Sequence, residues 1–149
     1  MSNFNTQVQE YLNLEFPKNR KLSQELEGGV GSLSIRRYKD VVIKVPHPEE
    51  YEFFVEGYQR AFQKGFINNL HIEGCELFVP FVEGTPITKN TDLTLLINQM
   101  QEAKHYLVDW KTDNVFITSN SNKVEVIDWG YWTDNREEFL RDYSRFISS

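Results

Sequence analysis

The stretch between residues 22 and 45 constrains the fold most, because three short runs of strand-forming residues follow one another there. Glycines separate the first run from the second, and Lys39-Asp40 separates the second from the third. The runs cover residues 22–26, 33–38 and 41–45. Short apolar runs that are broken by turn residues are typical of β-hairpins. The chain is therefore expected to build a small sheet early.

The rest of the chain alternates between helical and strand patterns. Helical spacing predicts helices over residues 49–64, 92–106 and 137–147, after a short N-terminal helix that ends at residue 16 before Pro17. Strands are predicted over residues 70–72, 76–82, 115–118 and 124–127, with a turn at residues 84–86. The helix over residues 92–106 carries Leu95, Leu96, Met100 and Ala103 at helical spacing, so these residues are expected on its apolar face. This order predicts an α+β fold with two unequal lobes.

Length, charge and cysteine content exclude several classes of protein. A chain of 149 residues suits one domain, residues 1–149, and its net charge of −6 argues against a general nucleic-acid binder. No apolar run is long enough to cross a membrane. The first residues lack a secretory signal pattern, so we expect a cytoplasmic protein or one that enters a host cell by a signal-peptide-independent route. The single cysteine, Cys75, excludes an internal disulfide and is expected in the core.

A Gly-rich turn and a strand lysine form the first candidate site. Residues 28–32 read Gly-Gly-Val-Gly-Ser, and glycines there let backbone amides approach a phosphate. Taken alone, a Gly-rich segment between two strands is more often only a hairpin turn than a phosphate-binding loop. Lys44 follows on the third strand, where it either points to solvent or meets a charge. A carboxylate of the next helix, Glu52 or Glu56, could hold it. We favour Glu56, because the longer gap leaves room for the chain to turn.

The strongest signal comes from three polar residues late in the chain. Asp109 and Asn114 are separated by four residues, and Asp128 follows Asn114 at a distance of fourteen residues. Mg²⁺ in phosphate sites takes few protein oxygens and completes its shell with phosphate and water. Asn114 and Asp128 could hold the metal while Asp109 orients or deprotonates a hydroxyl. Each residue alone would suit a polar turn, but the joint spacing favours a magnesium–phosphate site.

In chain order, Gly29-x-Gly31, Val42-x-Lys44, Asp109-x4-Asn114 and Asp128-x-Gly130 resemble the signature set of protein kinases. The resemblance implies a minimal bilobal kinase-like fold that binds ATP and Mg²⁺. Its small lobe, about residues 18–82, would hold an antiparallel sheet and one helix, and residues 83–149 would form a strongly truncated helical lobe. By the same resemblance, the nucleotide would contact Gly29, Gly31, Ser32, Val42, Lys44, Val79, Pro80, Val82, Phe116 and Ile127. Within this set Val79 would be the gatekeeper, and the Pro80 carbonyl and Val82 amide would face the adenine edge.

The brevity of the chain and residues 81–87 resemble the small secreted effector kinases of enteric bacteria, the OspG and NleH type. In that group the ubiquitin-conjugation machinery of the host supplies a stimulating partner. Three departures from the kinase pattern matter. Leu107 stands where the family has a histidine, Ser34 replaces the third loop glycine, and 19 residues after Gly130 leave no room for an activation segment. Specificity is therefore expected to come from another surface or from a partner.

Three functions are compatible with these residues. The first is a minimal Ser/Thr protein kinase that depends on a partner protein, in which Asp109, Lys44 and Glu56 are catalytic. The second is a pseudokinase or binding module, favoured by the missing histidine and the missing helical lobe. The third is a small-molecule kinase of the aminoglycoside type, suggested by Trp129 after Asp128 but disfavoured by the lack of a helical insert around an acceptor.

Overall fold

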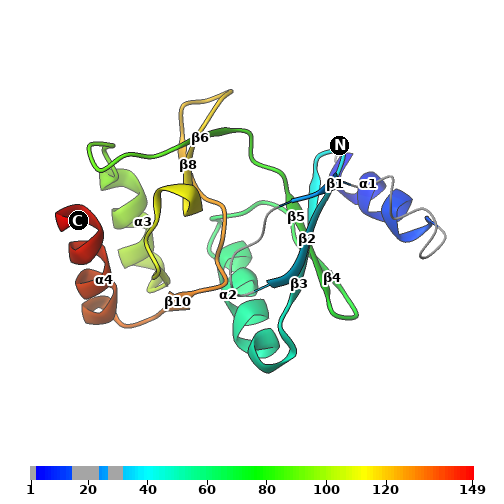
Figure 1. Cartoon of the computed structure of the whole chain (residues 1–149). Coiled ribbons are helices and arrows are strands. Elements are labelled where there is room, and N and C mark those ends of the chain that lie inside the picture. Colours follow the sequence, from blue (N-terminus) through cyan, green and yellow to red (C-terminus); the bar gives the residue numbers. More distant parts are fainter. Residues whose placement is uncertain (1–2, 15–23, 27–31) are drawn as a thin grey trace. The chain divides into compact units, whose positions relative to one another are not determined.

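The computed structural model describes residues 3–14, 24–26 and 32–149. In this part of the chain four α-helices accompany antiparallel sheets, so the predicted α+β class is confirmed (Figure 1). The chain divides into two compact units, residues 1–81 and residues 82–149, called here the first and the second unit. Among the described residues, none of the helices is both long enough and apolar enough to cross a membrane.

The first unit is built on a five-stranded antiparallel sheet with the strand order β1-β2-β3-β5-β4. The strands are β1 (Gln24–Glu25), β2 (Ser32–Tyr38), β3 (Val41–Pro46), β4 (His71–Glu73) and β5 (Glu76–Pro80). Lys39 has a φ of 52° in the tight turn between β2 and β3, a conformation that matches the twist of a hairpin. The predicted strands over residues 33–38 and 41–45 and the later hairpin are confirmed. For the first predicted strand, residues 22 and 23 lie outside the described residues.

Two helices cover opposite faces of this sheet (Figure 1). Helix α1 (Asn3–Leu12) buries Phe4, Val8 and Tyr11 against Val41, Ile43 and Phe78. Helix α2 (Tyr51–Gln63) follows the short 3-10 helix η2 (Pro48–Glu50) and buries Phe54, Val55, Tyr58 and Ala61. Side chains alternate along a strand, so the face of β3 opposite α1 carries Val42 and Lys44. The N-terminal helix ends at Leu12 and not at residue 16 as predicted; residues 15–17 lie outside the described residues.

The second unit contains a three-stranded sheet in the order β6-β8-β9 and a separate pair, β7 with β10. The elements are β6 (Gly84–Pro86), α3 (Thr94–Ala103), β7 (Tyr106–Leu107), η3 (Thr112–Asn114), β8 (Val115–Thr118), β9 (Val124–Val126), β10 (Trp132–Thr133) and α4 (Arg136–Ser148). The predicted turn at residues 84–86 is wrong, since these residues pair with β8. A Cβ on Gly84 would lie 2.2 Å from the carbonyl oxygen of Ile117, so glycine permits this close approach.

Three further expectations for helix and core need correction. Helix α3 ends at Ala103 because Lys104 turns to a φ of 54°, and Tyr106 pairs with Thr133 instead of continuing the helix. Leu95 is 86% exposed, whereas Leu96 and Met100 are buried, so the apolar stripe of α3 is narrower than predicted. Cys75 is an exposed residue of the β4–β5 turn and is not a core residue.

Candidate functional site

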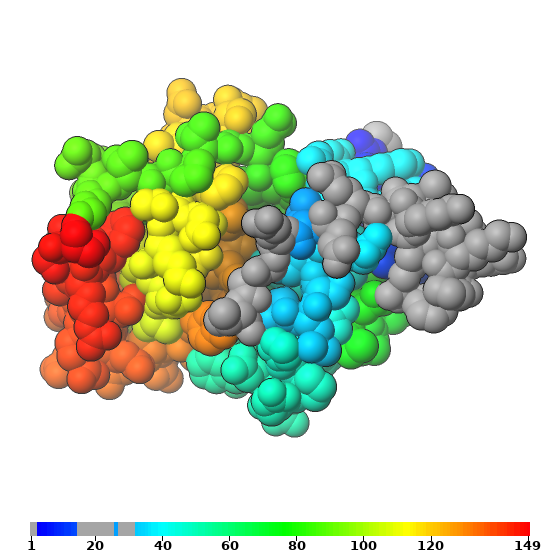
Figure 2. Space-filling view, in the orientation of Figure 1, coloured from blue at the N-terminus to red at the C-terminus, as the bar shows by residue number. Residues whose placement is uncertain are grey.

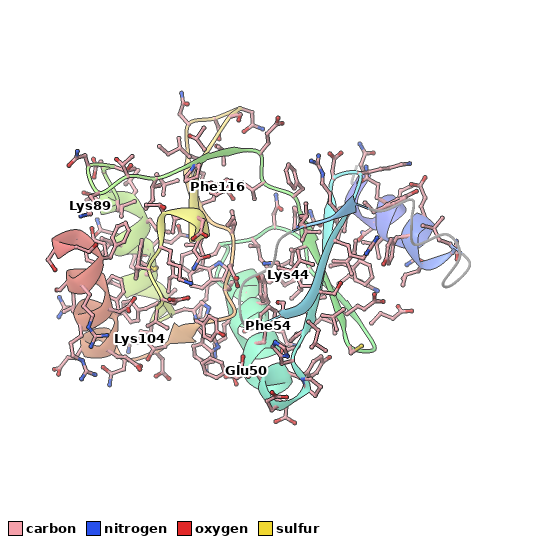
Figure 3. The ribbon with its side chains drawn as sticks, viewed as in Figure 1. Lys44, Glu50, Phe54, Lys89, Lys104 and Phe116 are labelled. Carbon is pink, nitrogen blue, oxygen red and sulfur yellow. The ribbon has the colours of Figure 1, made fainter. Side chains whose placement is uncertain are left out.

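Lys44 lies in the middle of the sheet with 5% of its surface exposed. Its Nζ donates a hydrogen bond to the hydroxyl of Tyr58 on α2, and Figure 3 shows it on the side of the sheet where Phe54 of α2 lies. A buried ammonium group needs polar partners, because burial without them costs several kcal/mol. Lys44, the residue predicted for a phosphate contact, is thus a buried lysine on the central strand β3 with a hydroxyl partner.

Tyr58 is not among the residues that the sequence predicts for the site. Glu56, the predicted partner of Lys44, accepts hydrogen bonds from Arg60 Nε at 2.9 Å and pairs with Arg60 Nη2 at 2.8 Å. Two residues correspond to about 200° of helical rotation, so Glu56 and Tyr58 project from nearly opposite sides of α2. The alternative, Glu52, is exposed. The Lys44–Glu56 pair stays a prediction, and the described contact to Lys44 comes from a tyrosine hydroxyl.

Two of the residues predicted for the adenine, Val42 and Val79, lie on the Lys44 face of the sheet in the first unit. Val42 and Val79 are directly paired between β3 and β5, and both are buried. Pro80 ends β5, and the next amide, that of Phe81, donates to the Asp40 carbonyl at 2.8 Å. Ser32 begins β2 opposite Pro46, while Gly29 and Gly31 lie outside the described residues. Val82 is the first residue of the second unit. The first unit thus presents a valine pair and a lysine on one face.

In the second unit, Asp109 sits on a sharply turned backbone. Its φ is 63°, in the left-handed region, which Asp and Asn adopt more readily than most residues. The Asn114 side chain donates from Nδ2 to the Asp109 carbonyl at 3.0 Å, and this bond links the two ends of the loop. Lys111 Nζ lies 3.3 Å from Asp109 Oδ2, and the Asp109 side chain is 38% exposed. The carboxylate is therefore accessible and has a cation beside it.

Lys111 was missed at the level of sequence, although its position two residues after Asp109 was visible. Most lysines in polar loops are solvated surface residues, so the sequence alone gives no reason to assign Lys111 to a site. The structure gives it a defined neighbour, the Asp109 carboxylate, and so joins an acid and an ammonium group at one point of the loop.

The β8–β9 hairpin brings Asn114 and Asp128 to the same end. Val115 pairs with Val126, and the Ile127 amide then donates to the Asn114 carbonyl at 2.9 Å. Asp128 follows directly, and its Oδ1 accepts a hydrogen bond from the Gly130 amide at 2.8 Å. Phe116, on the same strand as Val115, pairs with Glu125. The hairpin register thus explains why residues fourteen positions apart in the chain approach each other.

The donor set at this end fits a magnesium ion. Because Asn114 Nδ2 is the donor to Asp109, the amide oxygen is the atom that faces away from that bond. One amide oxygen and one carboxylate are few protein ligands, as is usual for Mg²⁺ in phosphate sites. Within the described part of the chain there is no cluster of three or more histidine, cysteine or acidic side chains that could hold a metal. A pair of ligands such as Asn114 and Asp128 is not a cluster of that kind.

Helix α4 fixes the loop that carries Asp109. The Trp110 amide donates to Asp142 Oδ2 at 2.9 Å, and the Trp110 indole donates to the Leu107 carbonyl at 2.8 Å. The Trp110 ring is buried and packs edge-on against Tyr143 at 5.1 Å. Figure 2 shows α4, at the red end of the colour bar, against the yellow segment that contains this loop. Asp142 stands 32 residues from Trp110, and nothing in the sequence pattern pointed to the contact.

Helix α4 itself begins at a well-formed cap. The Asn135 side chain accepts hydrogen bonds from the amides of Glu137 at 2.9 Å and Glu138 at 3.0 Å, which satisfies two amides that the helix leaves without partners. The two glutamates also place negative charge at the positive end of the helix. The cap fixes where α4 starts and therefore where Asp142 meets the loop.

Comparison with known proteins adds no relative. No protein-family model matches the chain, and no curated protein shows significant sequence similarity to it. The kinase resemblance thus rests on the motif residues and on the arrangement described above, and it remains a prediction.

Proposed function

We propose that the chain is an ATP-dependent phosphotransferase with a minimal, kinase-like organisation, most simply a Ser/Thr protein kinase that depends on a partner protein. One observation supports this most: Asp109, Asn114 and Asp128 are linked at one end of the β8–β9 hairpin by the Asn114–Asp109 bond and the Ile127–Asn114 bond. Phosphoryl transfer to a hydroxyl uses a carboxylate at the acceptor and side chains that hold Mg²⁺ at the phosphates, and these three residues are of the types that fill those roles.

In this proposal each residue of the second unit has a separate task. Asp109 accepts the proton of the attacking hydroxyl, or orients that hydroxyl. Lys111, which lies 3.3 Å from the Asp109 carboxylate, balances negative charge next to the acceptor. Asn114 and Asp128 hold Mg²⁺, which when bound would neutralise charge on the phosphate oxygens. The Asp142–Trp110 bond keeps the loop in place while these contacts form.

The first unit would supply the nucleotide contacts. Lys44 is the charge for a phosphate, and the Val42–Val79 pair is the apolar surface for adenine. We further propose that Phe116 and Ile127 complete the adenine pocket, that the Pro80 carbonyl and Val82 amide face the adenine edge, and that Gly29, Gly31 and Ser32 approach the phosphates. Glu56 remains the candidate second partner of Lys44 if α2 rotates when nucleotide binds.

Thermal unfolding with and without Mg·ATP tests the proposal. A ligand at about a hundred times its dissociation constant adds roughly 2.7 kcal/mol to the native state. Wild type should gain this stability, Asp128→Asn should lose most of the gain, and the matched change Asp134→Asn at an exposed acid of the same unit should keep it. Asp109→Asn should fold and bind Mg·ATP normally, because asparagine accepts the same backbone conformation. It should transfer no phosphate, because the amide cannot accept the proton of the hydroxyl. Absence of any wild-type response would overturn the proposal.

A second candidate is a binding module without catalysis. It is favoured by the pairing of Glu56 with Arg60, since an active kinase-like site requires that carboxylate at the lysine. By resemblance, its partner would belong to the ubiquitin-conjugation machinery. Partner binding that survives both Lys44→Ala and Asp128→Ala, together with no stabilisation by Mg·ATP, would select this function.

A further inference from the structure

His105 is a buried polar residue that the proposed mechanism does not use. It is 1% exposed and follows the left-handed residue Lys104 at the end of α3. Its own amide donates to the Met100 carbonyl at 3.2 Å, which fixes the backbone at the start of the segment that leads to Asp109.

The imidazole of His105 contacts two indole rings. It is stacked on Trp129, with the ring centroids 4.6 Å apart and the planes inclined by 22°. The Trp132 ring is tilted against the imidazole, with the centroids 5.2 Å apart and the planes inclined by 46°. Trp129 is completely buried and directly follows Asp128 in the chain. The histidine ring therefore contacts the residue next to the proposed magnesium ligand.

The backbone joins the same two segments. Leu107 pairs with Trp132, and the Val108 amide donates to the Tyr131 carbonyl at 3.2 Å. Residues 106–108 thus run antiparallel to residues 131–133, with His105 directly before the first segment and Asp109 directly after it. This arrangement fixes the distance between the two acidic residues, because Asp109 and Asp128 are attached to segments that are packed against each other.

We propose that His105 is a positioning residue: its flat ring, stacked on Trp129, holds the Asp128 carboxylate in place relative to Asp109. The inference rests on the proposed function, in which Asp128 binds Mg²⁺. Loss of a residue that orients a metal ligand typically lowers metal affinity by about 10- to 100-fold. We expect the flat shape of the ring, and not its nitrogen atoms, to position Asp128. Another flat ring of similar size should therefore restore the magnesium affinity.

A magnesium titration at constant ATP tests this, with thermal stabilisation and tryptophan fluorescence as readouts. In His105→Ala the Mg²⁺ concentration for half-maximal response should rise about tenfold. His105→Phe should return it to near the wild-type value. The matched control is Leu96→Ala, which removes a buried side chain of α3 in the same unit and keeps all three rings, His105, Trp129 and Trp132, in the sequence. It should lower the melting temperature and leave the magnesium dependence unchanged. If His105→Ala does not fold, His105→Leu, which keeps apolar volume but not the flat ring, should show the same rise.

The outcomes separate this inference from the proposed function. A wild type that responds to Mg·ATP together with a His105→Ala protein of unchanged magnesium dependence would refute the positioning role and leave the function intact. An equal shift in His105→Ala and Leu96→Ala would also refute it, since the effect would then follow general stability. A wild type without any response would refute the proposed function itself and this inference with it.

Discussion

The two units of the molecule hold their key charged groups in different ways. Lys44 stands on a central strand and meets a side chain from the next helix, Tyr58, only fourteen residues later. Asp109 stands on a loop whose place depends on Asp142, 32 residues away from Trp110. The position of a strand residue is fixed by hydrogen bonds to the neighbouring strands. The position of a loop residue depends instead on the side chains that pack against the loop.

The same contrast appears in the packing. The first unit buries aliphatic and aromatic residues on both faces of a regular sheet, with α1 on one face and α2 on the other. In the second unit the loop is surrounded by rings: Trp110 lies 6.1 Å from Phe139 and 5.9 Å from Phe146. Changes to this aromatic cluster should therefore have larger effects than changes near Lys44.

The largest effect is expected from Trp110→Ala. Removal of a buried indole costs about 3–5 kcal/mol through lost burial and the cavity left behind. Urea unfolding should show this loss, while Phe53→Ala, at a ring that is 46% exposed on α2, should cost less than about 1 kcal/mol. Equal losses in the two variants would mean that the loop does not depend on its aromatic support.

A smaller effect is expected at Lys44. Lys44→Met removes the donor to the Tyr58 hydroxyl and should cost about 1–3 kcal/mol, because a buried polar group loses a partner. Tyr58→Phe in the same chain should recover most of the loss, since replacing both partners by apolar groups can be nearly neutral. A double-mutant cycle in urea measures this coupling. Additive losses would show that Tyr58 is not the main support of Lys44.

Asp142→Ala should destabilise the second unit by about 1.5 kcal/mol, the lower end for a hydrogen bond to a charged group, because Asp142 is only partly buried. If the proposed function holds, the change should lower kcat more than it raises KM, since the loop and not the nucleotide loses its support. Arg141→Ala, at an exposed position of the same helix, is the control. A pure KM effect would contradict the assignment of Asp142 to the loop.

Much of the fold could be predicted from the sequence where the pattern is local. The β2–β3 hairpin followed from its strand residues and a two-residue turn, and the β8–β9 hairpin likewise placed Asn114 near Asp128. The strand at Gly84 was not predictable, because its pairing with β8 depends on a close backbone approach that the glycine allows. Leu95 was assigned to the core from spacing alone, which cannot tell how wide the covered face of a short helix is.

For the candidate site, the sequence predicts the polar residues but not the contacts that support them. Lys44 and the three polar residues of the second unit follow from spacing, but their supports do not. Tyr58 lies within the predicted helix, where a tyrosine at helical spacing gives no sign that its hydroxyl meets Lys44. Asp142 and His105 are joined to the site by contacts between segments distant in sequence. Sequence periodicity reports which face of an element is buried and not which neighbour covers it.

The smallest effect on stability is expected from the ion pair that joins Glu10 of α1 to Lys39 in the β2–β3 turn. Lys39 Nζ lies 2.7 Å from Glu10 Oε1, and this hydrogen bond is the main reason that the pKa of Lys39 is raised above 10.5. Because the folded-state pKa is raised, the stabilisation is complete below pH 10.5 and is lost as the pH rises through the folded value. The difference in melting temperature between wild type and Glu10→Gln should be small at pH 7 and should shrink above pH 10.5. A difference that persists there would exclude the ion pair as its cause.

The left-handed backbone at Asp109 has an evolutionary consequence. Asparagine accepts that conformation nearly as well as aspartate, and the codons of the two residues differ by a single base. If the proposed function holds, a lineage that carries this chain could therefore lose phosphotransfer without losing the folded protein, and could regain it by the reverse change. Catalytic and purely binding forms would be immediate neighbours in sequence space, and selection on a partner-binding surface could act on both alike.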